Sequence, residues 1–152
     1  MYFTVSVRLK MKILTSCIFP TAIYGCETWS ITKESEKRII AFEMKCYRKI
    51  VHIPWTSKES NANIMKTLGL KKSLLKSKIK KLKLNYFGHL KRHDTLERDV
   101  LKGMVEDKRG RGRPQRRWHQ DILEWLKDGV MECGRWAQDR DFFQRTVWEA
   151  TS

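Results

Sequence analysis

Apolar residues recur along the chain at intervals of three and four, which is the spacing of one face of an α-helix. The clearest case predicts a helix over residues 32–51, with acidic residues in its first turn and an end before Pro54. We expect this helix to bury one apolar face, formed by Ile39, Phe42, Cys46 and Ile50.

A second long helix is predicted over residues 73–93. Its apolar positions step by four, three, four and four residues: Leu75, Ile79, Leu82, Tyr86 and Leu90. Between Lys71 and Arg92 the sequence has nine Lys or Arg and no acid. Like charges on adjacent turns repel, because no Glu is interleaved to form i,i+4 pairs. An anionic partner on the outer face of this helix would relieve that repulsion.

Shorter helices are predicted on both sides of these two. They cover about residues 5–22, with a kink or end at Pro20, and residues 57–68, 96–104, 118–128 and 139–150. Gly69 and Gly129 stand where helices are expected to end. Since no segment alternates like a strand, we predict an all-α fold, a helical bundle of about five to seven helices with a basic Gly/Arg-rich connecting arm.

The arm separates the predicted domains. Residues 108–117 contain six basic residues in ten, and the glycines and proline among them break every helical period. We expect a helical domain over residues 1–105, a basic linker or arm over residues 106–117, and a small C-terminal helical module over residues 118–152.

The charge balance favours nucleic acid as a partner. The chain has 32 Lys and Arg against 17 Asp and Glu, a net charge of +15, while 41% of its residues are apolar. This composition is typical of a folded domain that attracts a polyanion, although a basic protein without such a partner remains the alternative. The expected phosphate contacts are Lys76, Lys78, Lys80, Lys81, Lys83, Arg109, Arg111, Arg113, Arg116 and Arg117.

One stretch of the arm, from Arg111 to Pro114, is similar to the core of AT-hook peptides, in which two arginines flank a glycine and enter the minor groove. Gly110 stands where such a motif has proline. We favour general phosphate contacts over minor-groove recognition here, and a solvated linker is the third alternative.

Three short motifs follow one another: Tyr-Gly-Cys-Glu-Thr-Trp at residues 24–29, Tyr-Phe-Gly-His at residues 86–89, and Arg-Gly-Arg-Gly-Arg-Pro at residues 109–114 with Trp118 behind it. With them, the chain from about Val7 to Trp148 resembles the C-terminal thumb and tail region of non-LTR (LINE-type) retrotransposon endonuclease and reverse transcriptase polyproteins. The resemblance implies a thumb-like domain that holds RNA, an RNA–DNA hybrid or DNA while another domain does the chemistry.

Under this resemblance we expect a non-catalytic binding fragment with the polymerase core as a second partner. The alternatives are part of an active RNA-directed DNA polymerase whose catalytic palm is encoded upstream, or a decayed element with no present function. We expect Trp29, Tyr86 and Phe87 to pack in the core rather than stack on bases. An intracellular location is expected, in the nucleus rather than the cytoplasm.

No catalytic centre is predicted. Two-metal nucleotidyl transfer by a reverse transcriptase needs an Asp pair, and the sequence has no Asp-Asp. Asp139 is instead expected to cap a helix, while His89 and His93 lack further ligands for zinc. The cysteines form no Cys-x-x-Cys pair, so reduced structural thiols are expected. We expect no catalytic residue, metal, cofactor, secretory signal or membrane span.

Overall fold

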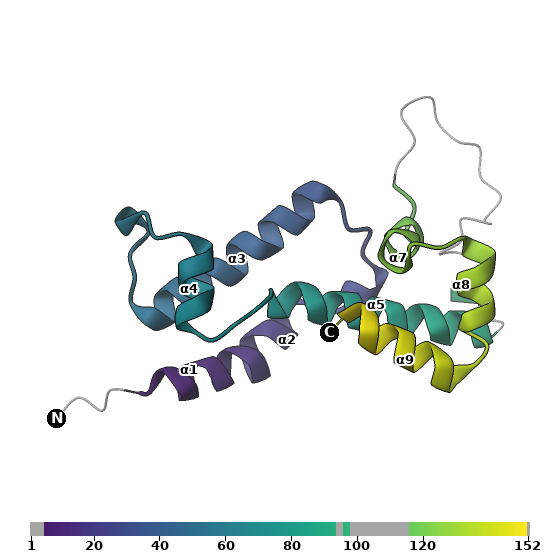
Figure 1. Cartoon of the computed structure of the whole chain (residues 1–152), viewed down its shortest axis with the longest axis horizontal. Coiled ribbons are helices and arrows are strands. Elements are labelled where there is room, and N and C mark those ends of the chain that lie inside the picture. Colours follow the sequence, from purple (N-terminus) through teal and green to yellow (C-terminus); the bar gives the residue numbers. More distant parts are fainter. Residues whose placement is uncertain (1–4, 94–95, 98–115, 152) are drawn as a thin grey trace. The chain divides into compact units, whose positions relative to one another are not determined.

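The computed structural model describes residues 5–93, 96–97 and 116–151. Throughout these ranges the regular elements are helices and no strand occurs, which confirms the predicted all-α class (Figure 1). None of the described helices is both long and apolar enough to cross a bilayer. Arg109, Arg111 and Arg113, with the AT-hook-like stretch, lie outside the described residues.

The chain forms two compact units. The N-terminal unit contains residues 5–24 and 33–77, and the C-terminal unit contains residues 25–32 together with the described residues from 78 onward. This division differs from the predicted one at residues 106–117. The reason is that the C-terminal helices share a core with the preceding long helix and do not form a module of their own.

The N-terminal unit begins with α1 (Val7–Ile13), a π-helical turn (Leu14–Ile18) and α2 (Phe19–Ala22), which follow one another without a break. Pro20 therefore does not end the helix. A proline has no amide hydrogen to donate to the preceding turn, and the wide π-turn directly before it accommodates the missing bond.

Helix α3 (Lys33–Val51) begins and ends as predicted, but its buried face is different. Phe42 is 38% exposed, whereas Glu43 is 1% exposed. The Glu43 carboxylate accepts hydrogen bonds from Leu74 N at 2.7 Å and Leu75 N at 3.1 Å, so it caps the first turn of the next long helix. Met44, Tyr47 and Ile50 are buried beside Glu43, so the inward side of α3 combines an apolar face with a carboxylate that caps another helix.

Helix α4 (Asn61–Thr67) is shorter than predicted, because residues 55–57 form a separate 3-10 turn. The hydroxyl of Ser60 caps its start by accepting from Asn63 N. Gly69, with φ +68°, ends it, and Leu70 N donates to Met65 O at 2.8 Å across the turn. The predicted glycine cap is thus confirmed.

The C-terminal unit gathers α7 (Gln120–Leu126), α8 (Val130–Trp136) and α9 (Arg140–Thr151) around the later turns of α5 (Leu74–Arg92) (Figure 1). They enclose one apolar cluster, formed by Leu84, Phe87, Leu90, Trp118, Ile122, Cys133, Ala137, Phe143 and Val147. Gly88 lets α5 and α9 approach closely, since a Cβ at this position would lie 2.7 Å from Phe143 Cε1.

Two helix ends in this unit test the predicted boundaries. Helix α7 ends earlier than predicted, at Lys127 with φ +57°, and Gly129 instead precedes α8, a helix that the sequence pattern did not indicate. Asp139 caps α9 as predicted, because its Oδ1 accepts from Asp141 N and Phe142 N, both at 3.0 Å.

Candidate nucleic-acid interface

The predicted lysines of α5 lie in different environments. Lys81 is exposed, and Lys78 is half-buried. Lys76 forms an ion pair with Glu36 of α3, and Lys80 Nζ lies 5.8 Å from the ring centroid of Trp125. An acid on another helix therefore neutralises part of the positive charge of α5. The like-charge repulsion from which we inferred an external anion is correspondingly weaker.

The prediction is wrong at Lys83. Its side chain is fully buried, while Leu82, the predicted apolar position, is 37% exposed. The ammonium group donates to the carboxylate of Asp121 and to the carbonyl oxygen of Trp29. Burial lowers the pKa of Lys83, and the neighbouring Asp121 partly opposes that shift. A buried ammonium group with internal acceptors cannot reach a phosphate.

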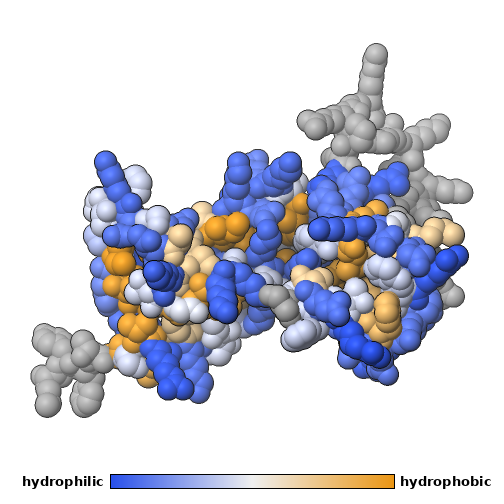
Figure 2. All heavy atoms as spheres, viewed as in Figure 1, coloured by the Kyte–Doolittle hydropathy of each residue, from blue (hydrophilic) through white to orange (hydrophobic). Residues whose placement is uncertain are grey.

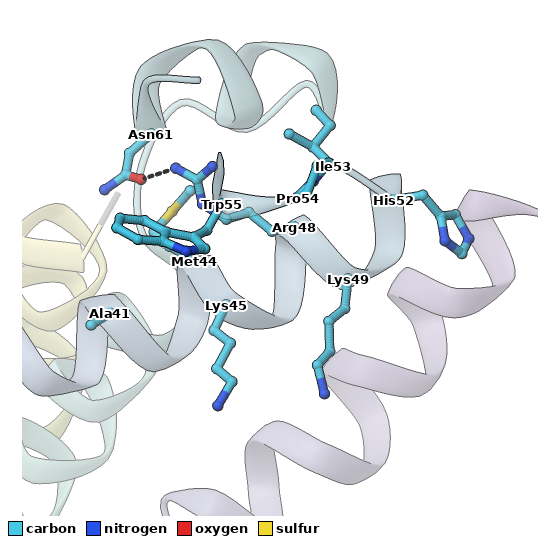
Figure 3. Close-up of a pocket in the computed structure, with 10 residues that line it drawn as sticks. All are labelled: Ala41, Met44, Lys45, Arg48, Lys49, His52, Ile53, Pro54, Trp55 and Asn61. Atoms are coloured by element: carbon cyan, nitrogen blue, oxygen red, sulfur yellow. Dashed lines mark hydrogen bonds between the residues drawn. The ribbon is translucent and has the colours of Figure 1, made fainter. Parts of the chain in front are cut away.

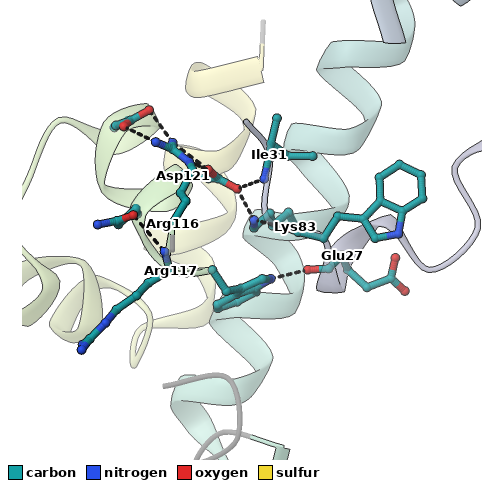
Figure 4. Close-up of polar contacts among 10 residues, drawn as sticks. Glu27, Ile31, Lys83, Arg116, Arg117 and Asp121 are labelled. Atoms are coloured by element: carbon teal, nitrogen blue, oxygen red, sulfur yellow. Dashed lines mark hydrogen bonds and ion pairs between the residues drawn. The ribbon is translucent and has the colours of Figure 1, made fainter. Parts of the chain in front are cut away.

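Arg116 is also engaged inside the protein. Its Nε donates to Asp121 Oδ1 at 2.7 Å, and its two terminal nitrogens donate to the Glu124 carboxylate at 2.9 and 2.7 Å (Figure 4). The hydrogen bonds to Glu124 raise the pKa of Arg116 most. We therefore remove Arg116, like Lys83, from the interface, whereas Arg117 is exposed and remains a candidate.

Residues of the first two sequence motifs lie around Trp118, the tryptophan that follows the third motif in the sequence. Its indole Nε1 donates to the carbonyl oxygen of Glu27 at 2.7 Å (Figure 4). Its ring centroid lies 6.1 Å from that of Tyr86 and 6.4 Å from that of Phe87. Phe87 is 3% exposed, as expected for a core residue, but Trp29 is 37% exposed. Packing within the C-terminal unit accounts for most of the motif aromatics.

The structure supports no metal centre in the part of the chain that it describes. The rings of His89 and His93 lie 4.6 Å apart, and both side chains are exposed. Among the described residues, no group of three or more His, Cys, Asp or Glu could hold a metal ion.

Most of the positive charge belongs to the N-terminal unit. Its described residues include 14 Lys or Arg and four Glu, a net charge of +10, against 12 basic and nine acidic residues, or +3, in the described C-terminal unit. All four glutamates have partners within the chain, since Glu34 pairs with Arg38, Glu36 pairs with Lys76, Glu43 caps α5, and Glu59 accepts from Asn63. Of the ten predicted contacts, only Lys76 lies in this unit.

A pocket of about 940 Å³ opens beside these charges, between the end of α3 and the start of α4 (Figure 3). Met44, Ile53 and Pro54 give it an apolar wall, and Lys45, Arg48 and Lys49 bring positive charge to it. Next to the pocket Lys10 Nζ donates to His52 Nε2 at 2.8 Å, which ties α1 to the end of α3.

Two groups at this pocket make few contacts within the described residues. The indole of Trp55 is 82% exposed. Arg48 donates through Nη2 to Glu59 O at 2.8 Å and to Asn61 Oδ1 at 3.0 Å, but its Nη1 is buried and has no acceptor in the part of the chain that the structure describes. Sequence reasoning missed both groups because it treated Pro54 only as the end of a helix. The available signal was an aromatic residue directly after that proline, with basic residues on both sides.

No protein-family model matches the chain, and neither a curated protein nor a solved structure matches it. The resemblance to retroelement polyproteins therefore stays a prediction from the sequence motifs.

Proposed function

We propose that this chain is a nucleic-acid-binding module that holds RNA or an RNA–DNA duplex by its phosphates and supplies no catalysis by itself. The observation that carries the proposal is the net charge of +10 on the described N-terminal unit, all four of whose described acids have partners within the chain. A polyanion that binds there releases its condensed counterions, which is the main source of affinity for such proteins.

The contacting groups in this proposal are exposed cations of the N-terminal unit. Lys37, Lys45 and Lys49 are exposed on α3. Lysine and arginine side chains of this kind position a nucleic acid through its backbone without reading its sequence. The proposal therefore includes little discrimination among sequences.

We also propose that the module derives from the thumb and tail of a retroelement reverse transcriptase, acts in the nucleus and has the polymerase core as its second partner. The sequence motifs support the origin. An apolar stripe on α1 supports a protein partner, because Leu9 is 48% and Ile13 is 47% exposed. Figure 2 shows further apolar side chains exposed among the hydrophilic ones on the face that it draws.

A fluorescence-anisotropy titration of the full chain tests the binding function. The probes are a labelled RNA hairpin, an RNA–DNA hybrid and an A·T-rich DNA duplex, each at several salt concentrations. We expect binding to all three, weakening steeply with salt. A strong preference for the A·T duplex would favour the AT-hook interpretation. Absence of binding at low salt by a chain with a helical circular-dichroism spectrum would contradict the proposal.

A further inference from the structure

We infer that the pocket beside Trp55 binds an unpaired nucleotide of a single-stranded nucleic acid, with its base on the indole and its phosphates near Lys45 and Lys49. This inference rests on the proposed function and adds a class of ligand to it. A module that only grips a duplex backbone has no need for an exposed aromatic ring, because the bases of a duplex are already stacked on one another.

Trp55 lies in a hydrogen-bonded turn. Pro54 fixes the backbone before it, and Ser57 N and Ser57 Oγ both donate to Pro54 O, at 3.2 and 2.7 Å. Lys58 N closes the turn on Trp55 O at 3.2 Å. The backbone of the turn is therefore well defined, yet it presents an indole that is 82% exposed. An exposed aromatic ring on a defined backbone is a platform on which proteins stack single-stranded bases.

Arg48 carries an unsatisfied donor at this pocket. Glu59 O and Asn61 Oδ1 hold one terminal nitrogen of the guanidinium in place, while the other, Nη1, is buried and has no acceptor among the described residues (Figure 3). A buried donor without a partner is costly, so an acceptor supplied by a ligand would be favoured once the guanidinium turns Nη1 into the pocket. The carbonyl oxygens and ring nitrogens of bases, and phosphate oxygens, are such acceptors.

Positive charge surrounds the pocket. Lys45 and Lys49 are exposed, stand one turn apart on α3 and extend from the same side of that helix (Figure 3). No Asp or Glu side chain of the described residues lines the pocket, and the carboxylate of the nearby Glu59 accepts from Asn63. The volume of about 940 Å³ lies at the upper end of the range of small-molecule sites. An apolar wall with an aromatic ring and a cationic rim fits a nucleotide better than an uncharged peptide.

The test compares Trp55→Leu with Trp148→Leu in the full chain. Trp148 is the matched control, because it is also largely exposed, at 66%, but lies on α9 in the other unit. The probes are a labelled oligouridine strand, the same strand with abasic positions, and a blunt RNA duplex. We expect Trp55→Leu to weaken binding of oligouridine about tenfold, with Trp55→Phe retaining most of the affinity. Binding of the duplex and of the abasic strand should not change, and Trp148→Leu should match the wild type throughout.

The outcomes separate this inference from the proposed function. If the wild-type chain binds none of the probes, the proposed function fails, and the inference fails with it. If the wild type binds but Trp55→Leu has no effect, or weakens all three probes equally, the inference alone is overturned. Polyglutamate serves as a competitor of oligouridine. If it competes only when Trp55 is present, the pocket binds an acidic peptide and the inference is overturned. Selective loss of the base-bearing strand supports it.

Discussion

The ammonium group of Lys83 and the carboxylate of Asp121 form an ion pair inside the C-terminal unit, where their side chains are 0% and 1% exposed. Asp121 also accepts from Ile31 N at 2.8 Å and from Arg116 Nε at 2.7 Å. One carboxylate thus joins the segment after the first motif, the long helix α5 and the start of the C-terminal helices. The pair is part of the fold and is not a surface for ligands.

Replacing Asp121 with Ala should therefore destabilise the protein strongly. The change leaves Lys83 buried without its counter-charge, which costs on the order of 3–5 kcal/mol. Urea unfolding followed by circular dichroism measures the effect. Lys81→Ala, on the exposed side of α5, is the control and should change the unfolding free energy by less than about 0.5 kcal/mol. Equal effects of the two substitutions would show that the pair is not buried.

Gly88 should not tolerate a methyl group. In a helix interior Ala is normally better than Gly by about 1 kcal/mol. At this position, however, a Cβ would lie 2.7 Å from Phe143 Cε1, and overpacking of this kind costs about 1–3 kcal/mol. Gly134→Ala in α8 is the matched control, since its Cβ would meet only the flexible end of Lys91, at 3.4 Å. Thermal unfolding should rank Gly88→Ala below the wild type and Gly134→Ala at or above it; the reverse order would refute this packing.

The cysteines should differ in reactivity. Cys26 is fully buried, and burial, reinforced by Glu27, raises the pKa of its thiol from 9.0 to about 11. Cys17 is exposed. Iodoacetamide followed by peptide mass spectrometry should find Cys17 modified first and Cys26 modified only after unfolding. Early modification of Cys26 in the folded protein would contradict its placement.

The raised pKa of the Cys26 thiol predicts that the stability of the protein depends on pH. Because the pKa is higher in the folded state, the contribution of the neutral thiol to stability is fully present below the unfolded value of 9.0 and is lost as the pH rises towards about 11. The difference in unfolding free energy between the wild type and Cys26→Ala should therefore be constant near neutral pH and shrink in alkali. A difference that grows with pH would have the wrong sign.

Local periodicity was sufficient to predict the all-α class, the bounds of α3 and the caps at Gly69 and Asp139, because these depend on neighbours in the sequence. It misplaced Lys83, whose partner Asp121 is 38 residues away, and gave no sign that Glu43 is buried, since the partner of Glu43, Leu74, is 31 residues away. A helix considered alone cannot reveal which of its charged groups is bound by another helix, so Lys83 was counted among the phosphate contacts.

The proposed interface lies on other residues than the predicted one for a related reason. Sequence reasoning ranked basic runs by local density, which favoured α5 and the arm, whereas the net charge of a compact unit depends on which distant segments fold together. The pocket at Trp55 depends on a 3-10 turn and on an arginine held by Glu59 and Asn61. Neither produces a periodic pattern in the sequence.

The most direct test of the central claim compares the salt dependence of binding in two variants, each with three positive charges removed. One carries Lys37→Gln, Lys45→Gln and Lys49→Gln in the N-terminal unit; the other carries Arg135→Gln, Arg140→Gln and Arg145→Gln, all exposed, in the C-terminal unit. The measured quantity is the slope of log affinity for an RNA hairpin against log salt. This slope is negative, and we predict that the first variant reduces its magnitude by about 0.7–0.9 for each phosphate that is no longer neutralised and that the second leaves it unchanged. Equal slopes in the two variants would contradict a nucleic-acid interface on the N-terminal unit.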